Sequence, residues 1–133
     1  GVHVGYDEPR AHRIFGGADV VLVPSRFEPC GLTQLYGLRY GAVPLVRRVG
    51  GLADTVVDAG TPEERIAGGT GISFDGSHAG SLEQAVQRML AWWQQPGAWQ
   101  LLQAQGMAAD FSWKGPAQAY MALYDRLCGV EPA

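Results

Sequence analysis

Residues 20–34 of this chain, VVLVPSRFEPCGLTQ, predict a strand followed by a loop and a helix. The rest of the fold can be worked out from this stretch. Residues 20–23 form an apolar run ended by Pro24, which is typical of a strand buried on both faces. A polar loop follows. A helix is expected over residues 31–40, with Gly41 as its C-terminal cap.

Strands and helices alternate on both sides of this stretch. The expected strands cover residues 2–5, 20–23, 44–47 and 72–74, and the expected helices cover residues 9–15, 31–40, 52–58, 82–93, 98–108 and the segment after Ser112. Ser81 is expected to cap the helix over 82–93, whose apolar stripe includes Trp93. The apolar stripes of this helix and of the helix after Ser112 are expected to pack against the sheet. Strand–helix–strand repetition implies parallel strands. We therefore predict an α/β fold, a Rossmann-like parallel sheet with helices packed against it.

Length and charge exclude several classes of protein. The 133 residues suffice for one domain with its own core, so residues 1–133 are predicted as a single domain. A net charge of −3 gives no general reason to bind nucleic acid or an acidic membrane. No apolar run reaches the roughly 18 residues that span a bilayer. We therefore expect no nucleic-acid and no membrane partner.

Cysteine and histidine content also narrows the function. Cys30 and Cys128 are far apart in sequence, and the three histidines show no metal-type spacing, so we expect no metal. So few cysteines favour a reducing cytoplasm over a disulfide scaffold. The chain opens with Gly1 and not with methionine, inside an expected strand. This favours a piece of a larger protein whose N-terminal side is missing.

The loop over residues 24–30 is the most informative place for a ligand, because open parallel sheets bind ligands beyond the carboxyl ends of their strands. The N–H groups of Gly31, Leu32 and Thr33 fall at the expected helix start, where backbone donors lack helical partners and attract anions such as phosphate. Glu28 beside them suits a sugar. Its carboxylate can accept hydrogen bonds from hydroxyls and stabilise a cationic anomeric carbon. The pattern indicates a glycosyl diphosphate site.

Other interpretations stay open from the residues alone. The residues slightly favour a structural interpretation of Glu28, either as a capping group or as a surface side chain ion-paired with Arg26. Cys30 could be a reactive thiol near a helix start or a packed, inert one. Arg47 and Arg48 could contact phosphate, although structural ion pairs or contacts to another domain are the preferred interpretation.

Two further groups have a structural and a functional interpretation. Gly50 and Gly51 could bring a second helix start towards the ligand or form a simple turn. The four tryptophans are expected in the core or at a domain interface and not as carbohydrate platforms.

Two longer stretches carry a family resemblance. SRFEPCGLTQLYGLRYG (25–41) and VRRVGGLADTV (46–56) strongly resemble bacterial glycogen synthases and plant starch synthases, and Phe111-Ser112-Trp113 is similar to the same family. The EPCGLTQ motif is highly specific. The resemblance covers nearly the whole chain and is weakest over residues 60–80.

The resemblance implies the C-terminal, donor-binding half of a GT-B glycosyltransferase, in which two Rossmann-like domains face a cleft. Such enzymes transfer glucose from ADP-glucose, a substrate and not a cofactor, to the non-reducing end of an α-1,4-glucan with retention of configuration. They require no metal. The implied partners are the nucleotide sugar, the α-glucan and the missing N-terminal domain of the same enzyme. Without that domain we expect weak donor binding and no glucan synthesis.

The resemblance also implies roles for particular residues. It places Glu28 at the donor glucose as the catalytic residue, the backbone at 31–33 on the distal phosphate, and Tyr6 against the adenine, where a structural tyrosine stays an open alternative. The implied donor-binding residues are Tyr6, Cys30, Gly31, Leu32 and Thr33.

Tyr36 indicates which branch of the family the chain resembles. Many related retaining glycosyltransferases carry a second glutamate at this position, eight residues after the first, so Tyr36 favours the glycogen and starch synthases. Two alternatives are another retaining GT-B glycosyltransferase with a different nucleotide sugar, and a non-catalytic, flavodoxin-like binding module.

Overall fold

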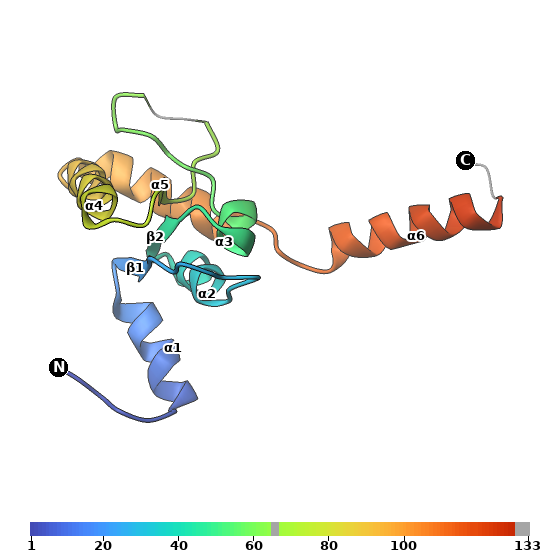
Figure 1. Cartoon of the computed structure of the whole chain (residues 1–133), viewed down its shortest axis with the longest axis horizontal. Helices are drawn as coiled ribbons and strands as arrows, with labels where there is room; N and C mark the ends of the chain where they lie inside the picture. Colours follow the sequence, from blue (N-terminus) through green and yellow to red (C-terminus); the bar gives the residue numbers. More distant parts are fainter. Residues whose placement is uncertain (65–66, 130–133) are drawn as a thin grey trace.

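Helices and strands alternate along the chain in the structure, a computed structural model that describes residues 1–64 and 67–129. The elements, in chain order, are α1 (Glu8–Gly17), β1 (Val20–Val23), α2 (Thr33–Tyr40), β2 (Val43–Arg47), α3 (Gly50–Thr55), β3 (Ile72–Phe74), α4 (Ala79–Trp93), α5 (Pro96–Ala108) and α6 (Lys114–Cys128). The three strands form one parallel sheet in the order β1-β2-β3, with helices around it (Figure 1). The predicted α/β class, with a parallel sheet and flanking helices, is confirmed.

The hydrophobic core lies on both faces of the sheet. On one face, α4 and α5 pack against the strands through a cluster that includes Leu45, Ile72, Met89, Trp92 and Leu102. On the other face, the cluster includes Val21, Val46, Leu52, Val56 and, at its margin, Phe15. Neighbouring residues of β2 therefore face opposite clusters, as the period of two in a strand requires.

Residues 2–5 form no strand, contrary to the prediction. Val2 and Val4 are almost fully exposed, and their backbone pairs with no strand in the described part of the chain. β1 is therefore an edge strand, and Leu22 on it is 51% exposed, although its apolar run predicted burial on both faces. Both errors have one cause, since a strand forms and is covered only where neighbouring elements meet it.

The helices begin close to where the sequence places them. Pro9 lies in the first turn of α1, as predicted, but Asp7 caps that helix and it continues through Gly17. α2 begins at Thr33 and ends at Tyr40, and the φ of 80° at Gly41 confirms the predicted cap. The cap of α4 is His78 and not Ser81, because the His78 ring nitrogen accepts from the Ser81 N–H at 3.2 Å.

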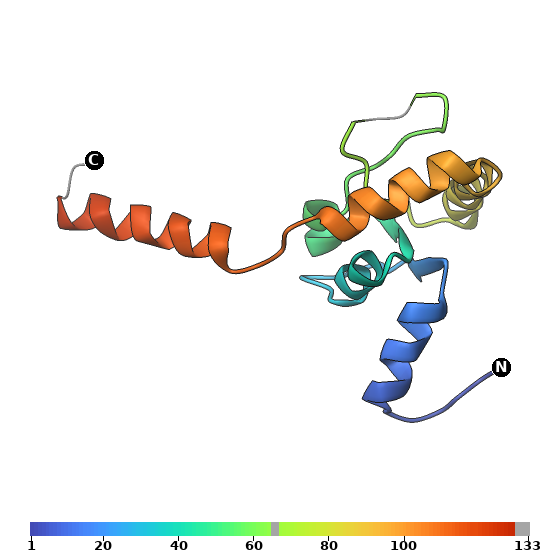
Figure 2. The ribbon, with the colours of Figure 1, turned by 180° about the vertical axis from the view of Figure 1, so that it is seen from behind.

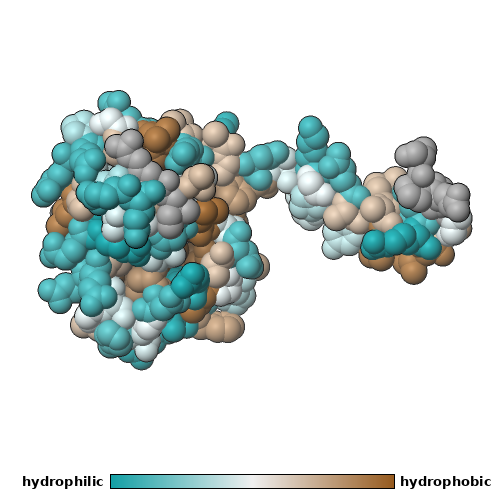
Figure 3. Space-filling model, turned by 90° about the horizontal axis from the view of Figure 1, so that it is seen from above, coloured by the Kyte–Doolittle hydropathy of each residue, from teal (hydrophilic) through white to brown (hydrophobic). Residues whose placement is uncertain are grey.

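α6 stands away from the rest of the molecule. None of its 15 residues is buried, and Figures 1 and 3 show it joined to the main body by a narrow neck. The sequence predicted that its apolar stripe packs against the sheet, and this prediction is wrong in the structure. The exposed stripe consists of Tyr120, Met121, Tyr124 and Leu127.

An ion pair between Asp58 and Arg88 ties the segment after α3 to α4. The guanidinium Nη1 lies 3.0 Å from Oδ1, and the carboxylate also accepts from the backbone N–H groups of Gly60 (2.7 Å) and Ser73 (3.0 Å). Burial raises the pKa of Asp58, but the hydrogen bonds from Arg88, Gly60 and Ser73 outweigh it and hold the pKa below its usual value. The sequence predicts a helix over residues 52–58 that includes Asp58. Instead, α3 ends before it and the carboxylate is half-buried.

Replacing this carboxylate is expected to destabilise the sheet. Asp58→Asn should lower the free energy of unfolding near neutral pH by about 1–3 kcal/mol, because Arg88 loses a charged partner. The folded-state pKa lies below the unfolded one, so the stabilisation is present above about pH 4 and is lost as the pH falls through the folded pKa. Urea unfolding followed by tryptophan fluorescence at neutral and acidic pH measures the effect.

Asp54→Asn is the control for this experiment, because Asp54 is exposed and makes no ion pair in the described chain. An equal loss of stability in the two variants, or a loss that does not shrink in acid, would contradict the role given to the pair.

Candidate functional site

The loops that follow the three strands are joined by one side chain at the carboxyl edge of the sheet. Arg47, the last residue of the central strand, donates from Nε to the carbonyl oxygen of Gly76 at 2.7 Å and from Nη1 to that of Arg26 at 2.8 Å. The loop after β1 is thus fixed to the loop after β3. Because backbone carbonyls occupy Nε and Nη1 of this guanidinium, Arg47 has a structural role in joining the two loops.

Arg48 is also committed to a structural partner. It forms an ion pair with Asp75, and the hydrogen bond from Arg48 holds the pKa of Asp75 below its usual value. The predicted preference for structural ion pairs is confirmed for Arg48.

Gln34 organises the loop that carries the predicted site. Its side chain is fully buried, and Nε2 donates to the carbonyl oxygens of Cys30 (3.2 Å) and Gly31 (3.0 Å) and to the Thr55 hydroxyl (3.1 Å). Its own oxygen Oε1 is buried without a hydrogen-bond partner in the part of the chain that the structure describes. The Gln34 amide therefore serves this loop as a donor. No pattern in the sequence indicated this role for Gln34.

This arrangement turns backbone donors outward. The described peptide bonds are all trans, and in a trans peptide the N–H points opposite to the C=O of the same unit. Since two carbonyls point to Gln34, the N–H groups of Gly31 and Leu32 point away from it. Neither they nor the N–H of Thr33 has a partner among the described residues. Three unpaired donors at a helix start form an arrangement that binds anions.

Glycines make this close packing feasible. Gly31 has a φ of +74°, and a Cβ there would lie 2.5 Å from Oε1 of Gln34. A Cβ on Gly51 would lie 2.0 Å from the carbonyl oxygen of Cys30, and the Gly51 N–H donates to the carbonyl oxygens of Glu28 (3.2 Å) and Pro29 (3.1 Å). The glycines at the start of α3 therefore pack against the loop after β1 and hold it by hydrogen bonds, a role that no sequence pattern predicted.

Glu28 lies half-buried in the same loop. Its Oε2 accepts a hydrogen bond from the Ser25 hydroxyl at 3.2 Å, and within the described chain the carboxylate makes no ion pair, so the expected pairing with Arg26 is not formed. The Oε1 atom is left without a partner there. Cys30, two residues on, is a free and exposed thiol. One carboxylate oxygen and three backbone donors are thus available within a short loop.

Tyr6 lies apart from this loop. The N-terminal segment runs at the far end of α1, well away from the loop after β1 in Figures 1 and 2, and Tyr6 is 94% exposed. The strand that was expected to place Tyr6 is not formed. The structure therefore brings together the predicted site residues Glu28, Cys30, Gly31, Leu32 and Thr33, but not Tyr6.

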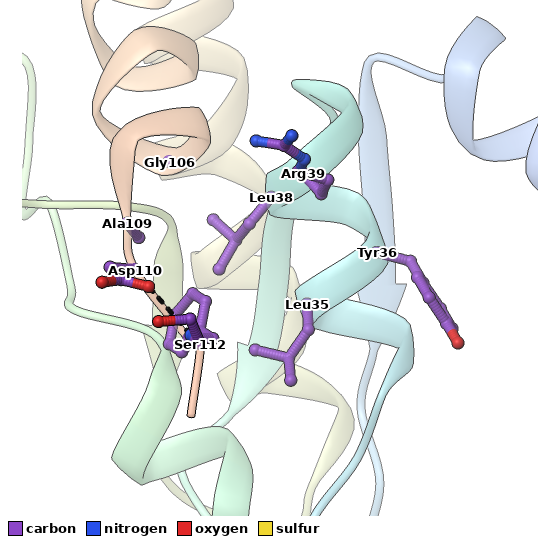
Figure 4. Close-up of a pocket in the computed structure, with 9 residues that line it drawn as sticks. Leu35, Tyr36, Leu38, Arg39, Gly106, Ala109, Asp110 and Ser112 are labelled. Atoms are coloured by element: carbon purple, nitrogen blue, oxygen red, sulfur yellow. Dashed lines mark hydrogen bonds between the residues drawn. The ribbon is translucent and has the colours of Figure 1, made fainter. Parts of the chain in front are cut away.

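A separate hollow of about 360 Å³ lies between α2 and the chain that follows α5 (Figure 4). Leu35 and Leu38 point into it, whereas Tyr36 points away. On the opposite wall, Asp110 accepts from the Ser112 N–H at 2.8 Å, and this hydrogen bond holds the pKa of Asp110 below its usual value. None of the predicted site residues lines this hollow.

Residues 1–64 and 67–129 contain no group of three or more His, Cys, Asp or Glu side chains that could hold a metal ion. In the same part of the chain, no helix has the length and apolar character that crossing a membrane requires.

Comparison with known proteins identifies relatives of this chain. No family model matches it. Two proteins named glycogen synthase, from Pectobacterium carotovorum and Pectobacterium atrosepticum, are 57% identical to it over 129 residues, which are 96% of this chain. The chain is a homologue of the glycogen synthases. It spans about a quarter of the length of these relatives, 26% in each case.

A solved structure supports the same conclusion for the fold. The catalytic domain of starch synthase IV from Arabidopsis thaliana, bound to ADP and acarbose, matches this glycogen synthase homologue with a TM-score of 0.83 and 34% identity. The match covers 92% of this chain and 25% of that chain. The predicted resemblance to glycogen and starch synthases is confirmed.

Filling the space at Gly51 is expected to displace the loop of Glu28. In Gly51→Ala, the added Cβ would lie 2.0 Å from the carbonyl oxygen of Cys30, and overpacking of this kind costs about 1–3 kcal/mol of stability. The amide NMR signals of residues 30–33 should shift, and the midpoint of unfolding should fall.

Gly97→Ala is the matched control, since a Cβ on Gly97 meets nothing within 4 Å and alanine favours a helix. It should leave both the loop signals and the fold intact. A Gly51→Ala protein with native stability and unmoved loop signals would show that the close approach is not required.

Proposed function

We propose that this chain is the donor-binding half of a GT-B glycogen or starch synthase, which transfers glucose from ADP-glucose to the non-reducing end of an α-1,4-glucan with retention. The observation that carries the proposal is the set of three unpaired N–H groups at Gly31, Leu32 and Thr33 beside Glu28. The homology to glycogen synthases supports it, and so does the match to a starch synthase bound to ADP and acarbose.

In this proposal the distal phosphate of the donor accepts hydrogen bonds from the three N–H groups. Hydrogen bonds to a charged group contribute about 1.5–3 kcal/mol each, and the positive end of the α2 dipole adds about 0.3–1 kcal/mol. Cys30 lies next to the same phosphate. The backbone thus provides the anion site, without requiring Arg47 or Arg48, which have structural partners.

Glu28 acts on the sugar. Its free carboxylate oxygen accepts a hydrogen bond from a glucose hydroxyl, and its charge stabilises the positive anomeric carbon that develops as the bond to phosphate breaks. The Ser25 hydroxyl, which donates to the other oxygen at 3.2 Å, orients the carboxylate.

The remaining parts of the proposal concern the whole enzyme. Tyr6 contacts the adenine, which requires the N-terminal segment to lie nearer to the loop after β1 than it does here. A preceding domain supplies the acceptor groove and closes over the donor, which excludes water from the reaction. This chain alone binds donor weakly and makes no glucan. Its free thiols fit a reducing cytoplasm.

An NMR titration with ADP-glucose tests the phosphate site. We expect shifts at residues 30–33 with a dissociation constant on the order of 1 mM. Thr33→Pro should weaken binding at least tenfold, because proline removes one N–H donor and also disfavours the helical backbone conformation of Leu32 before it (φ −112°, ψ −22°). Ala79→Pro removes the N–H donor at the first position of α4, after the extended residue His78, and should leave the affinity unchanged. Thr33→Val removes the side-chain hydroxyl but keeps the backbone N–H, so it shows which of the two groups contributes to binding.

The outcomes divide the alternatives. Shifts clustered elsewhere, or none in a folded sample, would overturn the site in this chain. A preference for UDP-glucose would assign the chain to a transferase with another donor. The absence of any nucleotide preference, together with indifference to Glu28, would favour a non-catalytic module.

A comparison of ADP with ADP-glucose tests the role of Glu28. Glu28→Gln should lower the affinity for ADP-glucose several-fold, since a charged acceptor for the sugar hydroxyl is lost, but should not lower the affinity for ADP. Glu83→Gln, on the exposed side of α4, is the control. If ADP and ADP-glucose lose affinity equally, Glu28 does not face the sugar.

A further inference from the structure

A shallow hollow of about 340 Å³ lies at the opposite end of β1 from the Glu28 loop. Asp19 on its rim directly precedes β1, so the hollow lies at the amino end of that parallel strand, whereas the Glu28 loop follows the carboxyl end. The rest of its wall comes from the end of α4 and the first half of α5. The lining residues are Asp19, Trp93, Pro96, Trp99, Gln100 and Gln103.

An indole ring held in a fixed orientation lies in this hollow. Trp93 is 47% exposed, although its sequence pattern predicted it in the core stripe of α4, where Trp92 is buried instead. Its ring meets the buried ring of Trp99 edge-on, with centroids 5.1 Å apart and planes at 79°. A ring fixed in this way loses little conformational freedom when a ligand stacks on it.

Three polar side chains line the hollow together with this ring. The Nε2 of Gln103 donates to the carbonyl oxygen of Gly41 at 2.7 Å, which fixes the amide and leaves its Oε1 without a partner in the described chain. Gln100 and Asp19 are exposed, and their side chains make no hydrogen bond or ion pair with the residues that the structure describes. The hollow therefore offers amide donors and acceptors and a carboxylate acceptor beside an aromatic face.

The chemistry of the lining restricts the ligand. No lysine or arginine lines the hollow. The start of α5 at Pro96 attracts an anion only weakly, and the full charge of Asp19 opposes it, so a phosphate or a carboxylate ligand is disfavoured. A pyranose ring has the complementary surface, because an apolar C–H face can stack on an indole while the hydroxyl rim exchanges hydrogen bonds with amides and a carboxylate.

We propose that this hollow binds a glucose unit of an α-1,4-glucan, at a second site remote from the donor loop. The choice of α-glucan rests on the proposed function; the preference for a neutral sugar rests on the lining alone. A polymeric acceptor held here would keep its free ends near the protein at a high effective concentration.

An NMR titration of the full chain with maltoheptaose tests the site. We expect a saturable shift of the Trp93 indole N–H and of the Gln100 and Gln103 side-chain amides, at concentrations on the order of 1–10 mM. Trp93→Ala should weaken binding at least tenfold, and Gln100→Ala, an exposed change that leaves the core intact, should weaken it several-fold. Trp113→Ala removes another exposed indole and should change nothing.

Each other result would overturn the proposal. The absence of a saturable shift at Trp93 rejects the site, an equal response to cellohexaose rejects the α-glucan, and a response to choline without one to maltoheptaose reassigns the hollow to cations. The donor site is tested separately, by the shifts that ADP-glucose causes in the amide signals of residues 30–33. If maltoheptaose shifts the Trp93 signal but ADP-glucose does not shift residues 30–33, only the proposed donor function is rejected. The reverse result rejects only the second site.

Discussion

The hydrogen bonds from the Gln34 amide to two backbone carbonyls determine what the carboxyl edge of this sheet offers to a ligand. A peptide unit cannot present its oxygen and its N–H on the same side, so satisfying the carbonyls of Cys30 and Gly31 from inside leaves donors on the outside. The rest of the site follows from this constraint. Glycine is required at position 31 because the amide lies so close, glycine at 51 leaves room for the loop, and Arg47 fixes the loop to its neighbour across the sheet.

Local signals in the sequence predicted the elements well, and long-range contacts explain what they missed. The apolar runs at 20–23 and 72–74 and the Gly41 cap depend on adjacent residues, and all three were correct. The run at 2–5 has the same local character, but a strand also needs a partner, which spacing alone cannot reveal. Gln34 is linked to Thr55 and Asp58 to Arg88, so no short window shows that either residue is buried and paired. The EPCGLTQ motif indicated the loop after β1 as the candidate site, whereas the internal geometry of this loop became visible only in three dimensions.

The two ends of the strands present different chemical groups. At the carboxyl ends of the strands, the available groups are main-chain N–H donors and a carboxylate, which suit the two halves of a sugar diphosphate. At the amino end of β1, they are an indole face, neutral amides and Asp19, which suit an uncharged ring. Helices α4 and α5 contribute to the second hollow and also form one side of the core, so the scaffold that stabilises the sheet also keeps the two surfaces apart.

The isolated position of α6 has a consequence for how the molecule unfolds. A helix of 15 residues without tertiary packing is marginal in water, whereas the sheet and its packed helices share one core and unfold together. Helical signal from α6 would fade gradually with temperature, while the buried indoles Trp92 and Trp99 would report a single sharp transition. The chain as described therefore consists of one cooperative unit and one helix that melts separately, and no single free energy of unfolding applies to both.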